Sequence, residues 1–319
     1  MNRRSLLKLG LAAPVMPLTL HLVPAAYADG HTDITQVVGV QNFRVGDWIV
    51  TALLDGAIPL GPGNFANLTE EEAQSFAEAA FLDTPDVSTG VNAYVLRNGQ
   101  ETILVDAGGA GAFPGLGGLS AALSAAQIEP ASVTRILLTH MHPDHIGGLL
   151  GADGAAFPNA SLHVHAADLG FWTNAEIKAQ VSEDFQPFFD LAMAVAGAYG
   201  DKIQTFDRDG NLIPGIRTRA LPGHTPGHTG FELSSGDDAL LIWGDIVHVA
   251  AFQFPKPDAV IGFDVDAQAA IETRRAVLAE AAESRVPVAG MHLPFPGVGY
   301  ISEDGDGYRF TPKAWSFSV

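Results

Sequence analysis

Apolar residues recur along the chain in short runs that Gly-, Pro- and Asp-rich turns separate. Runs of about four to eight residues rich in Val, Ile and Leu are typical of strands, whereas apolar positions three and four residues apart indicate helices. Strands are therefore predicted at residues 47–54, 92–97, 102–108, 133–140, 161–166, 202–206, 216–221, 228–233, 239–245 and 287–290. Helices are predicted at residues 69–80, 116–127, 174–198 and 266–284.

Both halves of the chain show strands followed by helices, without a fixed-period repeat or a low-complexity tract. No Pro/Gly/Ser-rich linker separates the halves. Because each sheet must bury an apolar face, this order predicts an α/β fold in which two sheets pack together with helices outside. We expect one layered domain rather than two independent ones.

The first 28 residues have the layout of an export signal. Arg3 and Arg4 precede an apolar stretch at residues 6–23, which ends in the small-residue sequence Ala26-Tyr27-Ala28. Prolines interrupt the apolar stretch, which argues against a membrane anchor. We expect residues 1–28 to be a twin-arginine-type signal peptide that is cleaved, and residues 29–319 to form the mature, periplasmic or secreted domain. This export route carries folded proteins, often with a cofactor already bound.

Charge and cysteine content exclude several classes of function. The formal charge is −19. Loss of residues 1–28 removes three basic residues and no acidic one, which brings the charge to −22. So acidic a surface argues against a nucleic acid or anionic-membrane partner, because phosphates would be repelled. Cysteine is absent, so no thiolate can act as a nucleophile or metal ligand.

The stretch THMHPDHIGG at residues 139–148 gathers three of the chain's 11 histidines. His140 and His142 alternate at the end of a predicted strand, so both imidazoles can reach one ion. Asp144 and His145 follow the turn at Pro143 and are expected to point to a neighbouring position. Imidazole and carboxylate are ligands suited to zinc and related divalent metals. The segment therefore predicts a metal site.

Three later segments place the same residue types after apolar strands. They are LPGHTPGH with His224, LLIWGDIVH with Asp245 and VAGMHLPFPG with His292. A carboxylate such as Asp245 is costly to bury alone. Taken singly, each could instead be a capping aspartate or a loop histidine. Their common position at strand ends, where α/β proteins gather their sites, favours one shared centre.

The pattern H-x-H-x-D-H, followed by G-H-T, G-D and a final histidine, resembles the metallo-β-lactamase superfamily. The match follows the motif order over most of the mature chain. THMHPDHIGGL, GDIVHVAAFQF and MHLPFPGVGY look closest to methyl parathion hydrolase and related lactonases and arylesterases. N-acyl-homoserine lactonases are more distant relatives with the same seven ligands. The resemblance implies a four-layer αββα sandwich.

The resemblance also implies how the ligands divide between two divalent metal ions, with zinc as the default. One ion would be held by His140, His142 and His224, and the other by Asp144, His145 and His292, with Asp245 bridging both. A hydroxide between the ions would be the nucleophile. His142, where the di-iron redox branch commonly has a carboxylate, argues against that branch. The catalytic residues expected are Asp144, Asp245 and His248.

The remaining histidines receive separate interpretations. His228 could be taken for the ligand in place of His224, but the family pattern places the metal on the histidine of Gly-His-Thr, so His228 is read as a residue that fixes the loop. His248 stands where related lactonases carry a tyrosine that contacts substrate. Either it hydrogen-bonds the substrate or it packs beside the ligands. His163 and His165 lack a carboxylate nearby in sequence and are read as structural.

Aromatic residues close to the ligands are candidates for substrate binding. They are Phe113, Phe171, Trp172 and Phe252, and no basic residue adjoins the motifs. We therefore expect an uncharged, apolar small-molecule substrate. Lactone or carboxyl-ester hydrolysis is the preferred function, with organophosphate triester hydrolysis as a side activity.

Three alternatives remain open at the level of sequence. The main activity could be hydrolysis of organophosphates of the methyl parathion type. A β-lactamase would use the same water, but the Lys, Ser or Asn that usually holds the antibiotic's carboxylate is not evident. An exported metal-binding protein without turnover is the third. No nucleic acid partner is expected, and no membrane partner after signal cleavage, while apolar segments outside the motifs could support a homodimer.

Overall fold

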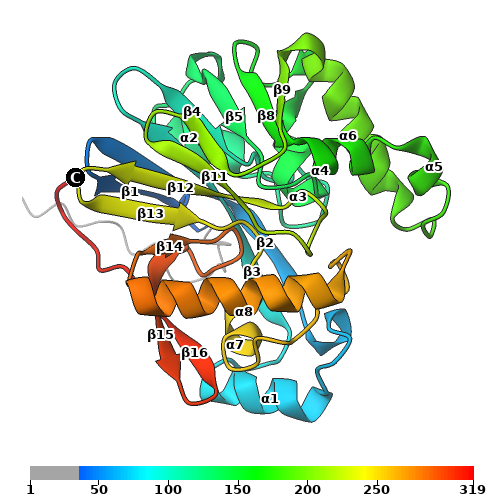
Figure 1. The fold of residues 1–319 in the computed structure, drawn as a ribbon, viewed down its shortest axis with the longest axis vertical. Helices are drawn as coiled ribbons and strands as arrows, with labels where there is room; N and C mark the ends of the chain where they lie inside the picture. Colours follow the sequence, from blue (N-terminus) through cyan, green and yellow to red (C-terminus); the bar gives the residue numbers. More distant parts are fainter. Residues whose placement is uncertain (1–35) are drawn as a thin grey trace, which may run out of the picture. The chain divides into compact units, whose positions relative to one another are not determined.

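Two seven-stranded sheets form the centre of the computed structural model, which describes residues 36–319 (Figure 1). All elements below belong to the compact unit Val38–Val319. The signal peptide predicted at residues 1–28 lies outside the described residues.

The first sheet has the strand order β1-β2-β3-β4-β5-β8-β9. Its first four strands pair antiparallel and the rest pair parallel. The strands are β1 Val40–Val45, β2 Trp48–Leu60, β3 Val87–Arg97, β4 Thr102–Val105, β5 Arg135–Leu137, β8 Ser161–His165 and β9 Ile203–Phe206. A separate two-stranded ribbon consists of β6 Leu150–Gly151 and β7 Gly154–Ala155.

The second sheet runs in sequence order from β10 to β16. Only β13 and β14 pair parallel, which brings their carboxyl ends to the same edge. The strands are β10 Gly210–Ile213, β11 Ile216–Ala220, β12 Thr229–Ser235, β13 Asp238–Ile242, β14 Val288–Ala289, β15 Val298–Asp304 and β16 Gly307–Pro312.

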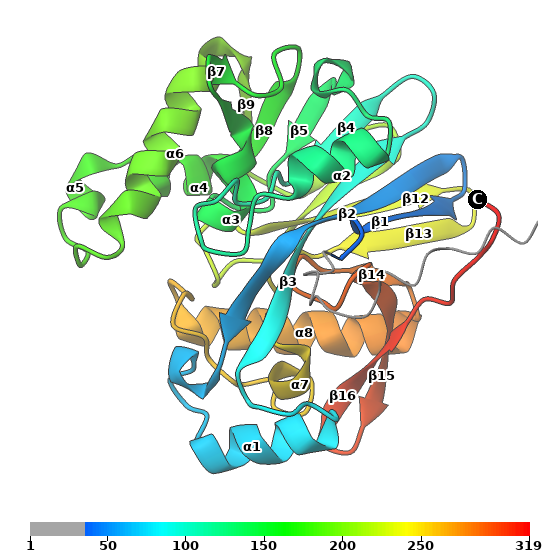
Figure 2. The same cartoon turned by 180° about the vertical axis from the view of Figure 1, so that it is seen from behind.

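The helices are α1 Glu70–Ala79, α2 Leu119–Ala125, α3 Pro143–Ile146, α4 Ala166–Trp172, α5 Ala175–Lys178, α6 Gln186–Tyr199, α7 Ala250–Gln253 and α8 Ala267–Ser284. α2, α4 and α6 pack on the first sheet and α8 packs on the second, while α1 and α7 lie together at one end of the unit (Figures 1 and 2). Short 3-10 turns are η1 Pro62–Asn64, η2 Pro130–Ser132, η3 Gly147–Leu149 and η4 Gly200–Lys202.

Three apolar clusters between the layers account for this architecture. The first packs α2, α4 and α6 on the first sheet, the second lies between the two sheets, and the third packs α8 on the second sheet. Inter-sheet residues such as Val50, Leu96 and Phe231 are fully buried. The layers are thus helix, sheet, sheet and helix, which confirms the predicted αββα sandwich.

Local signals explain where several helices begin. Thr69 accepts a hydrogen bond from the amide of Glu72, whose carboxylate accepts one from the amide of Thr69, so α1 opens with a capping box. The helix predicted at residues 174–198 is instead interrupted between α5 and α6. Pro187 stands in the first turn of α6, where proline is tolerated because its missing amide hydrogen would have no partner within the helix.

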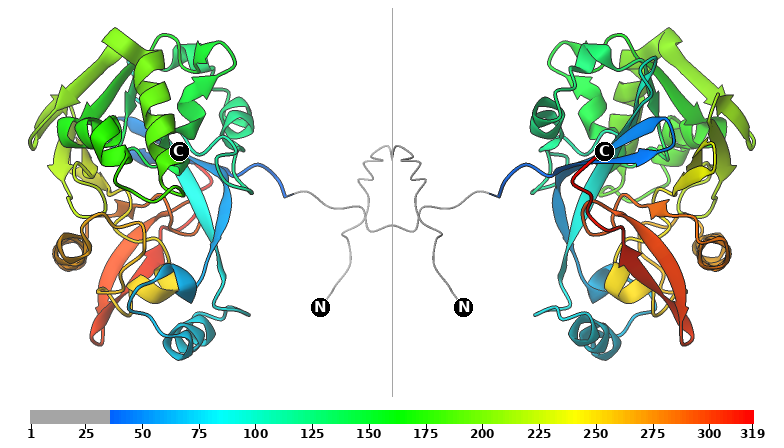
Figure 3. Two further views of the ribbon diagram at one scale, coloured as in Figure 1. Left: turned by 90° about the vertical axis from the view of Figure 1, so that its right-hand side faces the viewer. Right: turned by 90° about the vertical axis from the view of Figure 1, so that its left-hand side faces the viewer.

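The hairpin β15–β16 is an element that the strand prediction missed. It lies with α1 and α7 at one end of the unit in all views, including the two side views (Figure 3). Within the part of the chain that the structure describes, no helix combines the length and the apolar character needed to cross a membrane.

Candidate metal centre

The seven predicted ligands come together where strands of both sheets end. His140, Asp245 and His292 each stand three residues beyond the last residue of β5, β13 and β14, respectively. His224 lies in the loop between β11 and β12. The strand predicted at residues 133–140 is shorter than expected, so His140 stands in the loop that leads into α3.

Three imidazoles form the first group of ligand atoms, with Asp245 beside them. Nδ1 of His142 is 3.0 Å from Nε2 of His140 and 2.9 Å from Nε2 of His224. The Nε2 atoms of His140 and His224 are 3.2 Å apart. All four side chains are buried. Three ring nitrogens at such mutual distances suit a common cation.

The second group consists of Asp144, His145 and His292. Oδ2 of Asp245 lies between the two groups, 3.3 Å from Nε2 of His145, 3.0 Å from Nε2 of His292 and 3.4 Å from Nε2 of His224. Asp245 is therefore placed to share its carboxylate between two neighbouring ions. These two groups match the division that the resemblance implied, and Asp245, His248 and His292 form a third possible group.

The positions of the ring protons test whether cations fit the first group. The hydroxyl of Thr139 donates to Oδ2 of Asp106 at 2.6 Å, so it accepts a hydrogen bond from Nδ1 of His140 at 3.0 Å. Nδ1 of His224 donates to Oδ1 of Asp264 at 2.9 Å. With one proton on each neutral ring, Nε2 of His140 and Nε2 of His224 both carry lone pairs. Two lone pairs that face each other call for a cation between them.

The second group has the same arrangement. Nδ1 of His145 donates to Asp106 at 2.7 Å, and Nδ1 of His292 donates to the carbonyl of Gly90 at 3.0 Å. When each ring carries a single proton, its Nε2 lone pair therefore faces the carboxylate of Asp245. Among the described residues, Nε2 of His145 and Oδ1 of Asp245 are buried without a hydrogen-bond partner. Buried acceptors without donors fit divalent metal ions and little else.

The pKa values show how burial and the neighbouring carboxylates affect the protonation of the ligand histidines. Burial holds the pKa of both His140 and His142 well below the usual range, and neighbouring imidazoles add to this effect. Burial also lowers the pKa of His145, but the carboxylates of Asp245 and its neighbours outweigh it and hold that pKa well above the usual range. Burial raises the pKa of Asp245, yet His145 and other imidazoles hold it well below the usual range. The carboxylates thus favour a second proton on His145, and a bound metal ion would take the place of that proton at Nε2.

Three buried aspartates that were not singled out from the sequence orient the ligands. Asp106 binds His145 and Thr139, and Asp264 binds His224. Asp168 accepts hydrogen bonds from the amides of Met141 at 2.9 Å and Gly227 at 2.8 Å, which ties the two ligand loops together. Asp106 directly follows β4 in TILVDAG, so an aspartate at the end of an apolar strand was a usable signal. The sequence around Asp168 and Asp264 contains no comparable signal.

Close packing of backbone explains the two glycines that end THMHPDHIGG. A Cβ atom on Gly147 would lie 2.2 Å from the carbonyl oxygen of Gly109, and one on Gly148 would lie 1.9 Å from that of Ala107. The turn after α3 therefore has to pass directly over the loop that follows β4. Asp106 in that loop has a φ of 55°, a strained geometry that aspartate tolerates better than bulky residues do.

His228 uses both ring nitrogens for the protein itself. Nδ1 donates to the carbonyl of Leu221 at 2.9 Å, and Nε2 accepts from the amide of Asp245 at 2.9 Å. Burial lowers its pKa to about 3, so the ring is neutral. No lone pair remains for a metal. The side chain links the loop of His224 to the residue placed between the two groups.

His248 lies within the cluster rather than outside it. Its ring stacks on His292 with centroids 5.1 Å apart, and Nε2 is 3.2 Å from Oδ2 of Asp245. Nδ1 is buried and has no hydrogen-bond partner in the described part of the chain. A nitrogen atom is therefore free for a ligand. His163 lies in β8, where Nε2 contacts the hydroxyl of Ser161 at 2.9 Å, and His165 caps α4, both away from the ligands.

An apolar cavity of about 270 Å³, here called the ligand cavity, opens on the metal ligands. Phe113 lines it, together with apolar residues from β2, α6 and the segment before α8, namely Ile58, Leu60, Phe188 and Phe263. His142, Asp144, Asp245, His248 and His292 form its floor. No Lys or Arg is among the lining residues.

The other three aromatic candidates have packing roles, so the expectation that they contact substrate is corrected. Phe252 is fully buried and packs edge-on against Phe65, because α7 turns it into a small cluster with α1. Trp172 is buried behind His142, with ring centroids 5.0 Å apart, and Phe171 packs beside it. α4 therefore supports a ligand from behind.

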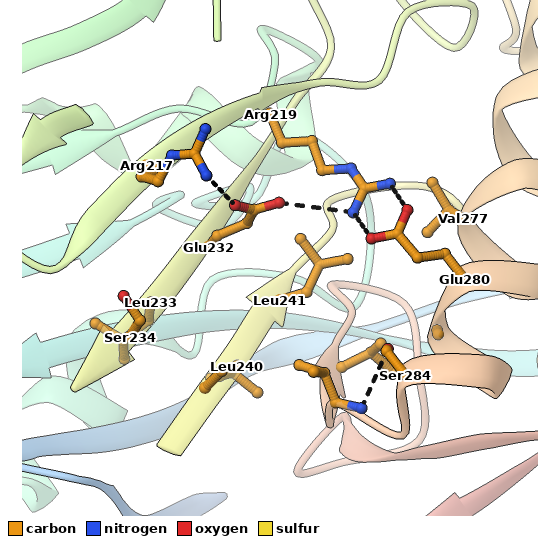
Figure 4. Close-up of a pocket in the computed structure, with 14 residues that line it drawn as sticks. Arg217, Arg219, Glu232, Leu233, Ser234, Leu240, Leu241, Val277, Glu280 and Ser284 are labelled. Atoms are coloured by element: carbon orange, nitrogen blue, oxygen red, sulfur yellow. Dashed lines mark hydrogen bonds and ion pairs between the residues drawn. The ribbon is translucent and has the colours of Figure 1, made fainter. Parts of the chain in front are cut away.

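A second hollow of about 310 Å³, the outer hollow, lies between β11–β13 and α8 (Figure 4). Arg219 pairs with both Glu232 and Glu280 at its rim, and Arg217 pairs with Glu232. None of the metal ligands lines it. Its charges are mutually neutralised, so it offers no anion site.

Comparison with known proteins agrees with this geometry. The sequence profile of the metallo-beta-lactamase superfamily matches residues 88–292, a stretch that runs from β3 to the last ligand. The chain belongs to the metallo-beta-lactamase superfamily. Membership places it among metal-dependent hydrolases and confirms the predicted superfamily.

Two solved structures are similar over most of the chain, and one curated relative is similar over about half of it. The crystal structure of hydrolase AbOPH of the beta lactamase superfamily is 32% identical with a TM-score of 0.83, and the match covers 88% of this chain and 100% of that one. AidC, a dizinc quorum-quenching lactonase in complex with a product, is 27% identical with the same TM-score and coverage. Beta-lactamase-like protein 2 homolog of Drosophila melanogaster is 28% identical over 171 residues, 52% of each chain, so the match spans about half of that relative's length.

Proposed function

We propose that the protein is a dimetal hydrolase that cleaves uncharged, apolar lactones and carboxyl esters. The observation that carries this proposal is the ligand cavity, which is apolar, lacks any cationic side chain and opens directly on the predicted ligands. Apart from the metal ions themselves, an anionic group of a substrate would find no cationic side chain in this cavity. The likeness to AidC, whose structure contains N-hexanoyl-L-homoserine as product, supports a lactone.

The residues of the chain would hold two divalent cations, most simply zinc. His140, His142 and His224 would bind one, Asp144, His145 and His292 the other, and Asp245 both. When bound, such ions would supply Lewis acidity and lower the pKa of a water molecule, so that hydroxide is available near neutral pH. Asp106 and Asp264 would keep the ring protons on Nδ1, so that Nε2 stays free.

His248 would act on the substrate itself. It lines the ligand cavity, and its Nδ1 is buried without a partner. A neutral imidazole at this position could hydrogen-bond an oxygen of the substrate or the leaving group. The aromatic residues Phe113 and Phe188, which meet edge-on with centroids 6.1 Å apart, would hold the apolar part of the substrate.

A substrate panel tests the proposal. The purified, metal-loaded protein would be assayed with γ- and δ-lactones, acyl-homoserine lactones, aryl esters, paraoxon-like triesters and nitrocefin. We expect the highest kcat/KM on a lactone or ester and little turnover of nitrocefin, because no Lys or Arg lines the cavity to hold its carboxylate. Nitrocefin as the best substrate would indicate a β-lactamase, and metal binding without any turnover would indicate a metal-binding protein.

Organophosphate triester hydrolysis of the methyl parathion type is the second candidate. The same neutral cavity favours it, because a phosphotriester is also an uncharged electrophile with a good leaving group. The ratio of kcat/KM for a lactone to that for a triester separates the two. A ratio below one would make the triester activity the main one.

Export remains part of the proposal. The twin arginine and small-residue pattern at residues 1–28 support a periplasmic or secreted enzyme without membrane association after signal cleavage. We further propose a small-molecule substrate as its partner and a homodimer as its assembly. Cell fractionation of wild type and an Arg3→Lys, Arg4→Lys variant would test the route. Export that is unaffected by the double substitution would contradict it.

A further inference from the structure

A second groove reaches the metal ligands separately from the ligand cavity. It has a volume of about 630 Å³ and lies between α1, the start of β3, α7 and the hairpin β15–β16, here called the α1 groove. These elements stand together at one end of the unit in every view (Figures 1 to 3). His248 and His292 line both the α1 groove and the ligand cavity. The two stacked rings thus form a wall that the two spaces share.

The walls of the α1 groove are apolar and without free charge. Ala80, Leu82 and Ala251 contribute to them, and the charged residues in the lining are Asp304 and Arg309. These two side chains pair with each other at 2.8 Å. Because their charges cancel, the groove suits an uncharged, apolar occupant rather than an anion.

Phe81 is next in the chain to two residues that line the α1 groove. It stands between Ala80 and Leu82 in the chain, and 96% of its surface is exposed. Its φ is 58°, because it follows α1 as the left-handed residue that is usually glycine. The amide of Leu82 donates to the carbonyl of Ala77, and that of Phe81 to the carbonyl of Glu78, as this helix ending requires. Because it is exposed, the ring gains little packing within the described chain, and its neighbours Ala80 and Leu82 both line the groove.

We propose that the α1 groove binds an uncharged alkyl or acyl chain of the substrate while the carbonyl group that reacts lies at the ligand cluster. Two observations support this occupant. His248 and His292 border both the α1 groove and the ligand cavity, and the lining of the groove is apolar. The inference rests on the proposed function and extends it to substrates with two apolar arms. One arm would occupy the ligand cavity and the other the α1 groove.

The dependence of KM on the length of the acyl chain tests whether the α1 groove binds that chain. 4-Nitrophenyl acetate, hexanoate and decanoate share a leaving group and differ only in the acyl chain. With wild type, KM should fall along this series by up to about fourfold for each methylene buried. Ala80→Trp, which fills the groove from an exposed position, should abolish most of that fall and leave kcat/KM for the acetate within about twofold. Ser284→Trp, a matched substitution at the outer hollow, should behave as wild type.

Phe81→Gly offers a variant that should fold at least as well, since glycine adopts this backbone without strain. This substitution should lower the ratio of kcat/KM for the decanoate to kcat/KM for the acetate, and it should leave kcat/KM for the acetate unchanged. If both Ala80→Trp and Phe81→Gly keep the chain-length dependence of wild type, the groove does not hold the chain and the proposal is overturned.

A binding measurement separates the groove from catalysis. 1-Decanol would be titrated into metal-loaded wild type, Ala80→Trp and Ser284→Trp by calorimetry. We expect Ala80→Trp alone to lose affinity, by about tenfold or more. Loss of affinity in a protein that hydrolyses no ester or lactone would support the groove and contradict the proposed function. Ester hydrolysis with equal 1-decanol affinity in all three proteins would support the function and overturn the groove.

Discussion

Asp106→Asn should remove metal from one group of ligands and spare the other. Oδ2 of Asp106 accepts hydrogen bonds from Nδ1 of His145 at 2.7 Å and from the hydroxyl of Thr139 at 2.6 Å. An amide nitrogen in place of Oδ2 would point its own hydrogen atoms at these donors. His145 can keep a hydrogen bond only by accepting at Nδ1, which moves its proton to Nε2. That proton would occupy the lone pair that faces Asp245.

The size of the effect follows from this change of tautomer. Loss of a partner that orients a metal-binding histidine costs about 10- to 100-fold in metal affinity, or roughly 1.4 to 2.7 kcal/mol. Oδ1 still accepts from the amide of Thr139 at 2.8 Å, so the backbone contact survives. We therefore expect a metal-binding defect in a folded protein. His140, His142 and His224 should keep their ion.

The assay is a zinc titration in competition with a chromophoric chelator, with the melting temperature as a folding check. Asp55→Asn is the matched control. Asp55 is also buried and accepts three hydrogen bonds, but all from the amides of Gly109, Gly117 and Leu119. It should lose stability without losing zinc affinity. Equal zinc stoichiometry and affinity in Asp106→Asn and wild type would refute the reasoning.

Three further outcomes follow from the structure. His248→Ala should lower kcat/KM on the best lactone or ester by about tenfold with unchanged metal content, since it removes a hydrogen bond to the substrate; unchanged kcat/KM would leave the residue a packing role only. Phe113→Ala should raise KM by about tenfold and leave kcat nearly unchanged, because it removes apolar contact area from the cavity; an unaltered KM would place the substrate elsewhere. Burial, aided by Arg135, lowers the pKa of His163 to about 4. The folded state therefore resists a proton that the unfolded chain accepts near pH 6.5, so stability should fall between pH 6.5 and 4 by at most about 1.4 kcal/mol per pH unit. Denaturant titrations of His163→Gln should show a shallower fall, and an identical slope would contradict the assignment.

The metal ligands could be predicted because their residue types and spacing are visible in the sequence alone. His140, Asp245 and His292 each follow an apolar strand, and the ends of neighbouring strands meet in space. Their residue types are rare in buried positions unless they bind something. The strand pattern and the metal-binding residue types therefore indicate the same positions without any knowledge of side-chain packing. The αββα layers followed in the same way from strands and helices that alternate along the chain.

Residues whose role depends on packing were not predictable. Asp168 and Asp264 stand in segments without a distinctive pattern, and only the fold brings them to the ligand loops. Phe252 and Phe113 looked alike in sequence, yet one is buried in a small core and the other lines the cavity.

The hairpin β15–β16 was missed although its turn holds the signals Asp-Gly at 304–305 and 306–307. Many positions in its two strands are exposed and polar, so a search for apolar runs does not detect these strands. The same reason explains why β1 and β10 were not predicted. Edge strands carry a weaker apolar signal than central ones.

The most direct test of the dimetal centre is the metal content of purified, zinc-reconstituted protein, measured by mass spectrometry for wild type and Asp245→Ala. We predict two zinc ions per chain in wild type, and in Asp245→Ala the loss of at least one ion together with turnover. Fewer than two ions in wild type would contradict the account, as would a variant that retains both ions and full activity.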